Sequence, residues 1–198
     1  LPTFGVILVA LGGCWLCLWQ QNWRYWGIAG IVAGMAMMLL TRPPDLILAD
    51  FGHFLAARTG DGDYRVAAGG EKIHRSFLVS ETGGRLLPWP GRGDPAADGL
   101  DCAAEGSCSY TAYGRRVAIV TAESGLQVLC DTVDAIVAQV PAGFACRGKI
   151  PVVDRIDSWR QGAVALWLDT DGISVVGANE SRGDRPWVPH PVSARERA

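Results

Sequence analysis

Residues 2–19, PTFGVILVALGGCWLCLW, decide how the rest of the chain is interpreted, because they contain no charged side chain. A short polar break, QQNWRY, follows at residues 20–25, and residues 26–40, WGIAGIVAGMAMMLL, are apolar again. A helix needs about 20 apolar residues to cross the hydrocarbon core of a bilayer. The first run is close to this length and the second reaches it with its flanks, so the sequence predicts two transmembrane helices.

Other features of this segment favour a membrane pair over a soluble helical hairpin. Aromatic rings gather around the polar break, as they do at lipid headgroups; they are Trp15, Trp19, Trp23, Tyr25 and Trp26. Gly27, Gly30 and Gly34 would let the two helices approach closely, and Pro43-Pro44 would end the second one. No basic region precedes the first run, which argues against a signal peptide. We therefore expect residues 1–44 to be the end of a larger membrane domain and residues 45–198 to be a separate α/β or α+β domain.

The charge of the second part argues against a broad phosphate-binding surface. Arg24 and Arg42 are the charged residues of the first 44, so residues 45–198 carry 16 basic against 20 acidic side chains, a net charge of −4. Affinity for nucleic acids rests largely on Lys and Arg that neutralise phosphates. A mildly acidic domain is therefore a poor candidate for such a surface.

Four of the six cysteines lie in this second part, and we expect them to form two disulfides. They are Cys102, Cys108, Cys130 and Cys146. A zinc site is the alternative, but the CxxC spacing of zinc knuckles is missing. The simplest of three possible connectivities has the local pairs Cys102–Cys108 and Cys130–Cys146. Disulfides favour an extracytoplasmic location, whereas Cys14 and Cys17, inside the first apolar run, are interpreted as packing residues.

Short apolar runs between turn residues predict a sheet-rich domain. We expect strands at residues 45–49, 54–58, 64–67, 109–113, 116–121, 135–140 and 149–153, and a final hairpin at residues 164–168 and 172–177. Helices are expected at residues 71–79 and 154–161, and residues 83–105 are expected to be a loop.

The densest polar cluster is Asp154, Arg155, Asp157, Trp159 and Arg160. In one interpretation it contacts a DNA strand, with Arg binding phosphates and Trp stacking on bases. In the other, Asp154 caps a helix, an arginine pairs with nearby acids, and the tryptophan lies in the core. A second segment, Arg182, Asp184, Arg185 and Trp187, is open to the same two interpretations.

Residues 152–168, VVDRIDSWRQGAVALWL, followed by residues 182–187, RGDRPW, resemble the C-terminal end of ComEC-type competence proteins of the proteobacterial kind. The resemblance implies a degenerate metallo-β-lactamase-like domain after a membrane domain, as part of a channel that takes up single-stranded DNA in natural transformation. It places the chain in the bacterial inner membrane as a multi-pass protein with the domain on the periplasmic side. Single-stranded DNA, membrane lipid, other competence proteins and a second copy of the chain are the partners it implies.

The chain departs from the enzymes of that fold. Metallo-β-lactamase-type hydrolases hold two metals with an HxHxDH cluster, whereas His53, His74 and His190 are far apart here. We therefore expect no catalytic residue, no metal site and no cofactor. A metal-dependent nuclease and a structural module without a DNA role are the alternatives that the sequence leaves open.

Overall fold

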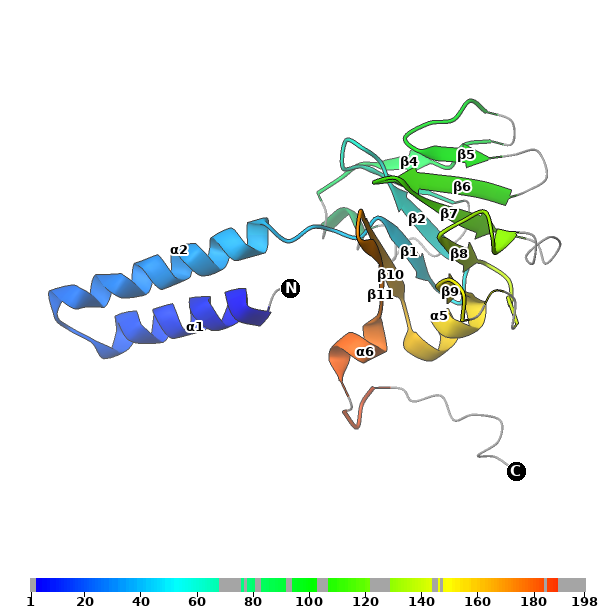
Figure 1. Ribbon diagram of the computed structural model, residues 1–198. Coiled ribbons are helices and arrows are strands. Elements are labelled where there is room, and N and C mark those ends of the chain that lie inside the picture. The colour runs from blue at the N-terminus through cyan, green and yellow to red at the C-terminus, as the bar shows by residue number, and fades with distance from the viewer. Residues whose placement is uncertain are drawn as a thin grey trace. The chain divides into compact units, whose positions relative to one another are not determined.

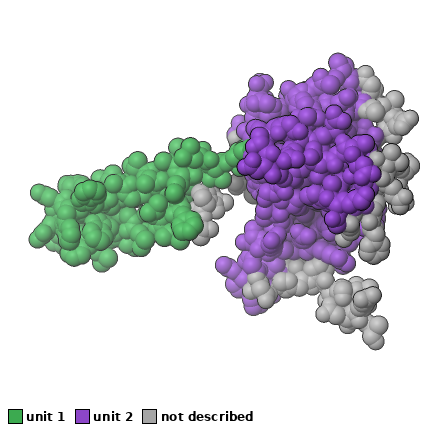
Figure 2. Space-filling view, in the orientation of Figure 1, with its two compact units in different colours: residues 1–43 green, residues 44–198 purple. Residues whose placement is uncertain are grey.

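The computed structural model divides the chain into two compact units, Leu1–Pro43 and Pro44–Ala198, which Figure 2 colours separately. The first unit is a helical hairpin, and the second combines two β-sheets with short helices (Figure 1). The structure describes residues 3–67, 76, 78–80, 83–91, 94–102, 107–121, 129–143, 146, 148–183 and 185–188.

The prediction of two membrane-spanning helices is wrong. In the first unit, helix α1 covers Thr3–Leu18 (16 residues) and helix α2 covers Trp26–Leu39 (14 residues), joined by the short 3₁₀ helix η1, Asn22–Tyr25. At a rise of about 1.5 Å per residue they are about 24 and 21 Å long, whereas the hydrocarbon core is about 30 Å thick. Among the described residues, no helix is both long and apolar enough to cross a membrane.

The error lies in the ends of the helices. The sequence interpretation counted flanking residues as helical, but α1 ends at Leu18 and α2 at Leu39. The finding also overturns the predicted location, a multi-pass protein of the bacterial inner membrane with its second part on the periplasmic side. The predicted fold class, two transmembrane helices followed by a degenerate metallo-β-lactamase-like domain, is replaced by a helical hairpin and an α/β domain with two mixed sheets.

Glycine lets the two helices of the first unit pack against each other. A Cβ atom on Gly12 would lie 2.6 Å from the carbonyl oxygen of Gly27, and one on Gly34 would lie 2.6 Å from that of Gly5. Near the turn, the rings of Trp15, Trp19 and Trp23 contact one another, with centroids 4.7 to 5.6 Å apart. The small-residue spacing that the sequence showed therefore serves helix packing inside the hairpin.

The second unit contains two mixed sheets. Within the described residues the first sheet has the strand order β11-β10-β1-β2-β3-β4, antiparallel except for the parallel pair β3–β4. Its strands are β1 Leu46–Ala49, β2 Phe54–Arg58, β3 Tyr64–Val66, β4 Leu86–Pro88, β10 Val164–Asp169 and β11 Gly172–Gly177. The second sheet has the order β5-β6-β7-β8-β9, with β7, β8 and β9 parallel. Its strands are β5 Leu100–Cys102, β6 Ser107–Ala112, β7 Arg115–Val120, β8 Ala135–Ala138 and β9 Val152–Val153.

The main core lies between the two sheets. Leucines of the first sheet meet aliphatic side chains of the second in one buried cluster, which includes Leu46, Leu48, Leu166, Leu168, Leu100, Val117, Ile119 and Val137. In β7 the neighbouring residues Ala118 and Val120 point to the opposite face, where they pack in a second buried cluster. Full burial of such a side chain stabilises the folded state by about 1.5–3 kcal/mol. Strand β7 is therefore covered on both faces.

Polar contacts join the two sheets at one end. The Tyr110 hydroxyl on β6 donates to the carbonyl oxygen of Arg58 on β2 (2.8 Å), and burial raises the pKa of Tyr110 well above its usual range. The Arg115 guanidinium on β7 donates to the carbonyl oxygen of Thr170 (2.7 Å), in the turn between β10 and β11. The same guanidinium pairs with Asp134 at 3.1 Å.

Most predicted strands are confirmed, and two short ones were missed. Residues 83–105, predicted as a loop, contain β4 and β5, and helix α6, Ala178–Arg182, was not predicted. The predicted helix at residues 154–161 is confirmed as α5, Arg155–Gln161. The predicted helix at residues 71–79 falls largely outside the described residues.

The four cysteines of the second unit form two disulfides, Cys102–Cys108 and Cys130–Cys146. The first joins the paired strands β5 and β6. The second closes a loop beside the outer face of the second sheet, where Cys146 packs with Ala118 and Val120. The connectivity is the local one that the spacing made simplest.

Replacement of Asp134 by asparagine should flatten the acid side of the stability curve. The backbone N–H of Arg116 donates to this carboxylate, and with the Arg115 guanidinium it lowers the pKa of Asp134. A lowered pKa in the folded state gives stability that is present above the pKa of the unfolded chain, about 3.9. That stability is lost as the pH falls through the lower, folded value.

Urea unfolding of the wild type and Asp134→Asn, at several pH values between neutral pH and the acid transition, measures how the free energy of unfolding depends on pH. We expect the variant to be less stable at neutral pH and to lose less stability on acidification. Asp131→Asn is the matched control, because the Asp131 side chain is 80% exposed and pairs with Lys149 at 3.4 Å. Equal acid slopes for the wild type and Asp134→Asn would contradict the prediction.

Candidate functional site

Asp154 is a helix cap buried in the structure. It is 0% exposed, and its Oδ1 atom accepts hydrogen bonds from the backbone N–H groups of Ile156 and Asp157, both at 2.9 Å. Its Oδ2 atom accepts a third, from Ala142 N–H at 3.0 Å. In return, Asp157 Oδ2 accepts from the Asp154 N–H, which completes a capping box. This residue therefore fixes the start of α5 and does not itself face a ligand.

Helix α5 divides its side chains between two faces. Residues four apart lie on the same face of a helix, and Arg155 and Trp159 form such a pair on the exposed side, next to the exposed Arg160. Trp159 is 44% exposed, so it does not lie in the core. Within the described part of the chain, neither arginine side chain has an ion pair. The second interpretation of this cluster, a capped helix with a paired arginine and a buried tryptophan, is thus correct for the Asp154 cap. It is wrong for Arg155, Trp159 and Arg160.

The turn between β1 and β2 lies beside α5 and carries an exposed aromatic ring. A Cβ atom on Gly52 would lie 3.5 Å from Arg155 Cβ, and the Gln139 side chain donates to the Gly52 carbonyl oxygen at 2.9 Å. Its neighbour Phe51 is 49% exposed and has a φ of 51°, and Asp50 has a φ of 52°. Bulky residues rarely adopt this left-handed conformation, which costs about 1–3 kcal/mol per residue. The ring of Phe51 therefore lies outside the core in a turn of unfavourable backbone conformation.

Helix α6, Ala178–Arg182, contacts the end of α5. The Asn179 side-chain amide donates to the carbonyl oxygen of Arg160 at 3.0 Å, so the end of α5 and the start of α6 are in contact. Figure 1 shows both helices at the same end of the second unit. The exposed Arg182 ends α6, one turn after Asn179. We call Phe51, Arg155, Trp159, Arg160 and Arg182 the α5–α6 surface.

The remaining predicted site residues form a separate pair after α6. The Arg185 guanidinium lies 5.7 Å from the ring centroid of Trp187, which is 73% exposed. Val188 is 3% exposed and anchors this segment in the domain. Asp184 lies outside the described residues.

Sequence reasoning missed Phe51, although a signal was present. Asp50-Phe51-Gly52 occupies a position between two strands where asparagine or glycine is usual. A large ring in such a turn is unfavourable for folding, so its presence indicates another use. The proximity of this turn to α5 could not be seen in the sequence, because the two are about a hundred residues apart.

The chemistry available at the α5–α6 surface is cationic and aromatic. In the described residues no group of three or more His, Cys, Asp or Glu side chains is placed to hold a metal ion. His53 is exposed in the β1–β2 turn, and His74 and His190 fall outside the described residues. Guanidinium groups bind phosphates, and exposed aromatic rings can stack on bases.

Comparison with known proteins brings no relative to this chain. No family model, curated protein or solved structure matches it. The likeness to ComEC-type proteins therefore rests on the amino-acid sequence, in which residues 154–187 are the most specific part.

Proposed function

We propose that residues 45–198 form a non-catalytic domain that binds single-stranded DNA in a DNA-uptake system. The observation that supports this proposal is the α5–α6 surface, in which Arg155, Arg160 and the exposed ring of Trp159 share helix α5 and the turn that carries the exposed Phe51 lies beside Arg155. Arginine side chains without ion pairs are ready to neutralise phosphates, and each exposed ring offers a face to a base.

The charge distribution favours a short, unpaired strand over duplex DNA. Three arginines on the surface would give a salt dependence with a slope of about −2 in a plot of log affinity against log salt, at roughly 0.7 per phosphate. Stacking on Trp159 requires a base that is not already stacked and paired. The acidic balance of the rest of the domain limits contacts elsewhere.

The resemblance extends the proposal to the setting of the domain. Natural transformation, other competence proteins and a second copy of the chain are the process and partners that it suggests. The absence of the HxHxDH pattern from the sequence supports a binding role over hydrolysis.

Changing the surface should abolish most of the binding to single-stranded DNA. We expect Trp159→Ala to weaken affinity of the 198-residue chain for fluorescein-labelled oligothymidine about tenfold, because stacking contributes about 1–3 kcal/mol per base. Arg160→Gln should weaken it less and lower the salt slope by about 0.7. Fluorescence anisotropy over a range of salt concentrations measures both.

The controls are an exposed ring and an exposed arginine on other elements. Tyr113→Ala, in the β6–β7 turn, and Arg116→Gln, on β7, should leave affinity unchanged. Equal loss from the control and surface variants would contradict the proposal. No binding at any salt concentration would favour the structural module, and metal-dependent cleavage of the oligonucleotide would favour the nuclease.

A further inference from the structure

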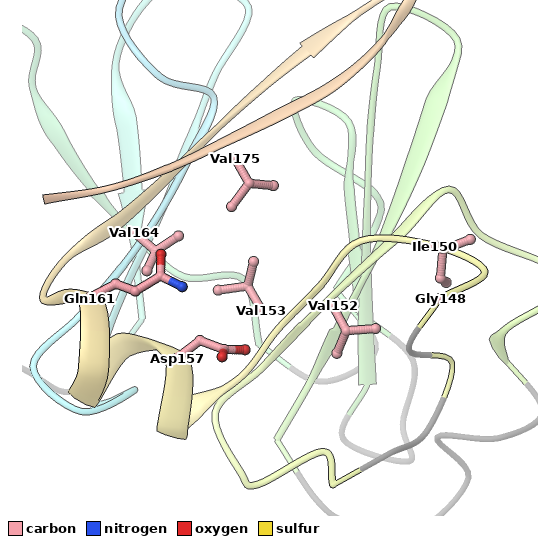
Figure 3. Close-up of a pocket in the computed structure, with 8 residues that line it drawn as sticks. All are labelled: Gly148, Ile150, Val152, Val153, Asp157, Gln161, Val164 and Val175. Atoms are coloured by element: carbon pink, nitrogen blue, oxygen red, sulfur yellow. The ribbon is translucent and has the colours of Figure 1, made fainter. Parts of the chain in front are cut away.

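A cavity of about 220 Å³ lies between the edges of the two sheets, next to α5 (Figure 3). Strands β9 and β11 are the outermost strands of their sheets, and Val153 and Val175 from these strands line the cavity with Val164 of β10. Sites for drug-sized ligands have volumes of about 300–1,000 Å³. This one suits a smaller group, of the size of one heterocyclic ring system.

Two polar side chains enter the cavity from α5. Figure 3 shows Asp157 and Gln161 extending from the helix toward Val153. They are four residues apart, so their Cβ atoms are about 5–6 Å apart on one face. That face is opposite to the one that carries Arg155 and Trp159.

The Gln161 amide is available to a ligand. The side chain is half-buried, and it makes no hydrogen bond with any residue that the structure describes. A Cβ atom on Gly177 would lie 2.5 Å from Gln161 Oε1, so the glycine leaves the space that this side chain occupies. Asp157 Oδ2 accepts from the Asp154 N–H at 3.2 Å, and the residue has a further interaction besides this one. A carboxylate has about four acceptor sites, so it can still accept from a ligand. The cavity therefore offers a carboxylate acceptor and an amide with both a donor and an acceptor, against an apolar wall.

We infer that this cavity binds one unpaired nucleobase, and that guanine is the base it favours. Guanine presents N1–H and N2–H donors, which a carboxylate can accept, next to the O6 acceptor, to which the Gln161 amide can donate. Enzymes that read an extruded base use the same combination of edge hydrogen bonds and apolar walls. The inference rests on the proposed function, since the base would belong to a strand held on the α5–α6 surface.

The position of the cavity fits such a strand. Trp159 and Arg160 lie in sequence between Asp157 and Gln161, on a helix of seven residues that is about 10 Å long. The cavity lies on the opposite face of this short helix, so a strand on the α5–α6 surface would reach it by turning one base around the helix. The surface would hold the backbone without regard to sequence, and the cavity would add base preference.

An extended peptide that pairs with an edge strand is the other occupant to consider. Strand β9 has two residues, Val152–Val153, which gives little backbone to pair with. A peptide would also leave the Gln161 amide without a specific role. The polar pair on α5 favours the base.

The test compares oligothymidine with the same strand containing one central guanine. We expect the wild-type chain to bind the guanine-containing strand about tenfold more tightly, since a bidentate base contact contributes about 1–3 kcal/mol. Gln161→Leu keeps the size and removes the hydrogen bonds, so it should reduce this preference to about twofold or less while affinity for oligothymidine is retained. Asp157→Asn keeps an acceptor for the Asp154 N–H and should also reduce the preference. Ser174→Ala, at an exposed position of β11, is the matched control and should leave the preference intact.

The outcomes separate the two proposals. Binding of both strands with equal affinity, unchanged in Gln161→Leu, overturns the base pocket and leaves the proposed function standing. If neither strand binds, the methyl NMR signals of Val153, Val164 and Val175 are followed during titration with guanosine. Shifts that disappear in Gln161→Leu support the pocket while the proposed function fails, and no shifts overturn both. Shifts with a short extended peptide but not with guanosine overturn the base pocket in favour of strand addition.

Discussion

Replacement of Asp154 by alanine is expected to lower the free energy of unfolding by about 2–4 kcal/mol. Loss of a helix cap costs about 1 kcal/mol, and a buried N–H left without an acceptor costs about 1–3 kcal/mol. Asp154 is 0% exposed and accepts from Ile156, Asp157 and Ala142, so its removal does both. Guanidinium unfolding monitored by tryptophan fluorescence measures the loss.

Two further variants make this expectation specific. Asp154→Asn keeps one side-chain oxygen as an acceptor and should lose about half as much stability as the alanine variant. Asp101→Ala, at an exposed position of β5, removes a carboxylate of the same type and should change stability by about 0.5 kcal/mol or less. A loss below about 1 kcal/mol for Asp154→Ala would show that the cap is dispensable.

The second large effect is expected from the Cys130–Cys146 disulfide. Its cysteines are 16 residues apart, and a cross-link that closes a loop of this length stabilises a protein by about 3 kcal/mol. The double variant Cys130→Ala/Cys146→Ala should lose this amount in guanidinium unfolding. The loss should also loosen the packing of residue 146 against the outer face of the second sheet, where Ala118 and Val120 lie.

Comparison with the other disulfide tests the reason for this effect. Cys102 and Cys108 are six residues apart on paired strands, so the variant Cys102→Ala/Cys108→Ala should lose less, about 2 kcal/mol. The reverse order would contradict the explanation by loop length.

The two effects should not be additive. Ala142 lies inside the loop that Cys130–Cys146 closes, and its N–H donates to Asp154. Without the disulfide, Ala142 is held less firmly in place, so its hydrogen bond to Asp154 contributes less to stability. Combining Asp154→Ala with the double cysteine variant should therefore cost less than the sum, by about 0.5 kcal/mol or more.

Local patterns were sufficient to predict the strands whose signal lies in their own residues. Residues 54–57 are apolar and Arg58 leads into a turn, and together they form β2 as predicted. The hairpin of β10 and β11 was also predicted, from two apolar runs around Asp169-Thr-Asp-Gly. Strand β4 has three residues, Leu86–Pro88, in a stretch rich in glycine and proline. It exists because it pairs with β3, and nothing in its own sequence indicates that partner.

The limits of sequence reasoning at the site have the same origin. The Asp154 cap could be predicted, since an aspartate before a helix is a local signal. The exposed position of Trp159 could not, because the sequence does not say which face of α5 meets the sheets. Hydrophobicity likewise predicted two membrane spans, but it does not fix the residues at which α1 and α2 end.

The pairing of β1 with β10 sets an order on the folding of a newly synthesised chain. Leu46 of β1 lies opposite Leu166 of β10, so β1 cannot pair on this side until the ribosome has added 120 more residues. Contacts so distant in sequence form slowly, and until then β1 has an unpaired edge on which other chains can aggregate. A ribosome that stalls before residue 164 would therefore release a chain that is prone to aggregation, with every residue of β1 and β2 already made.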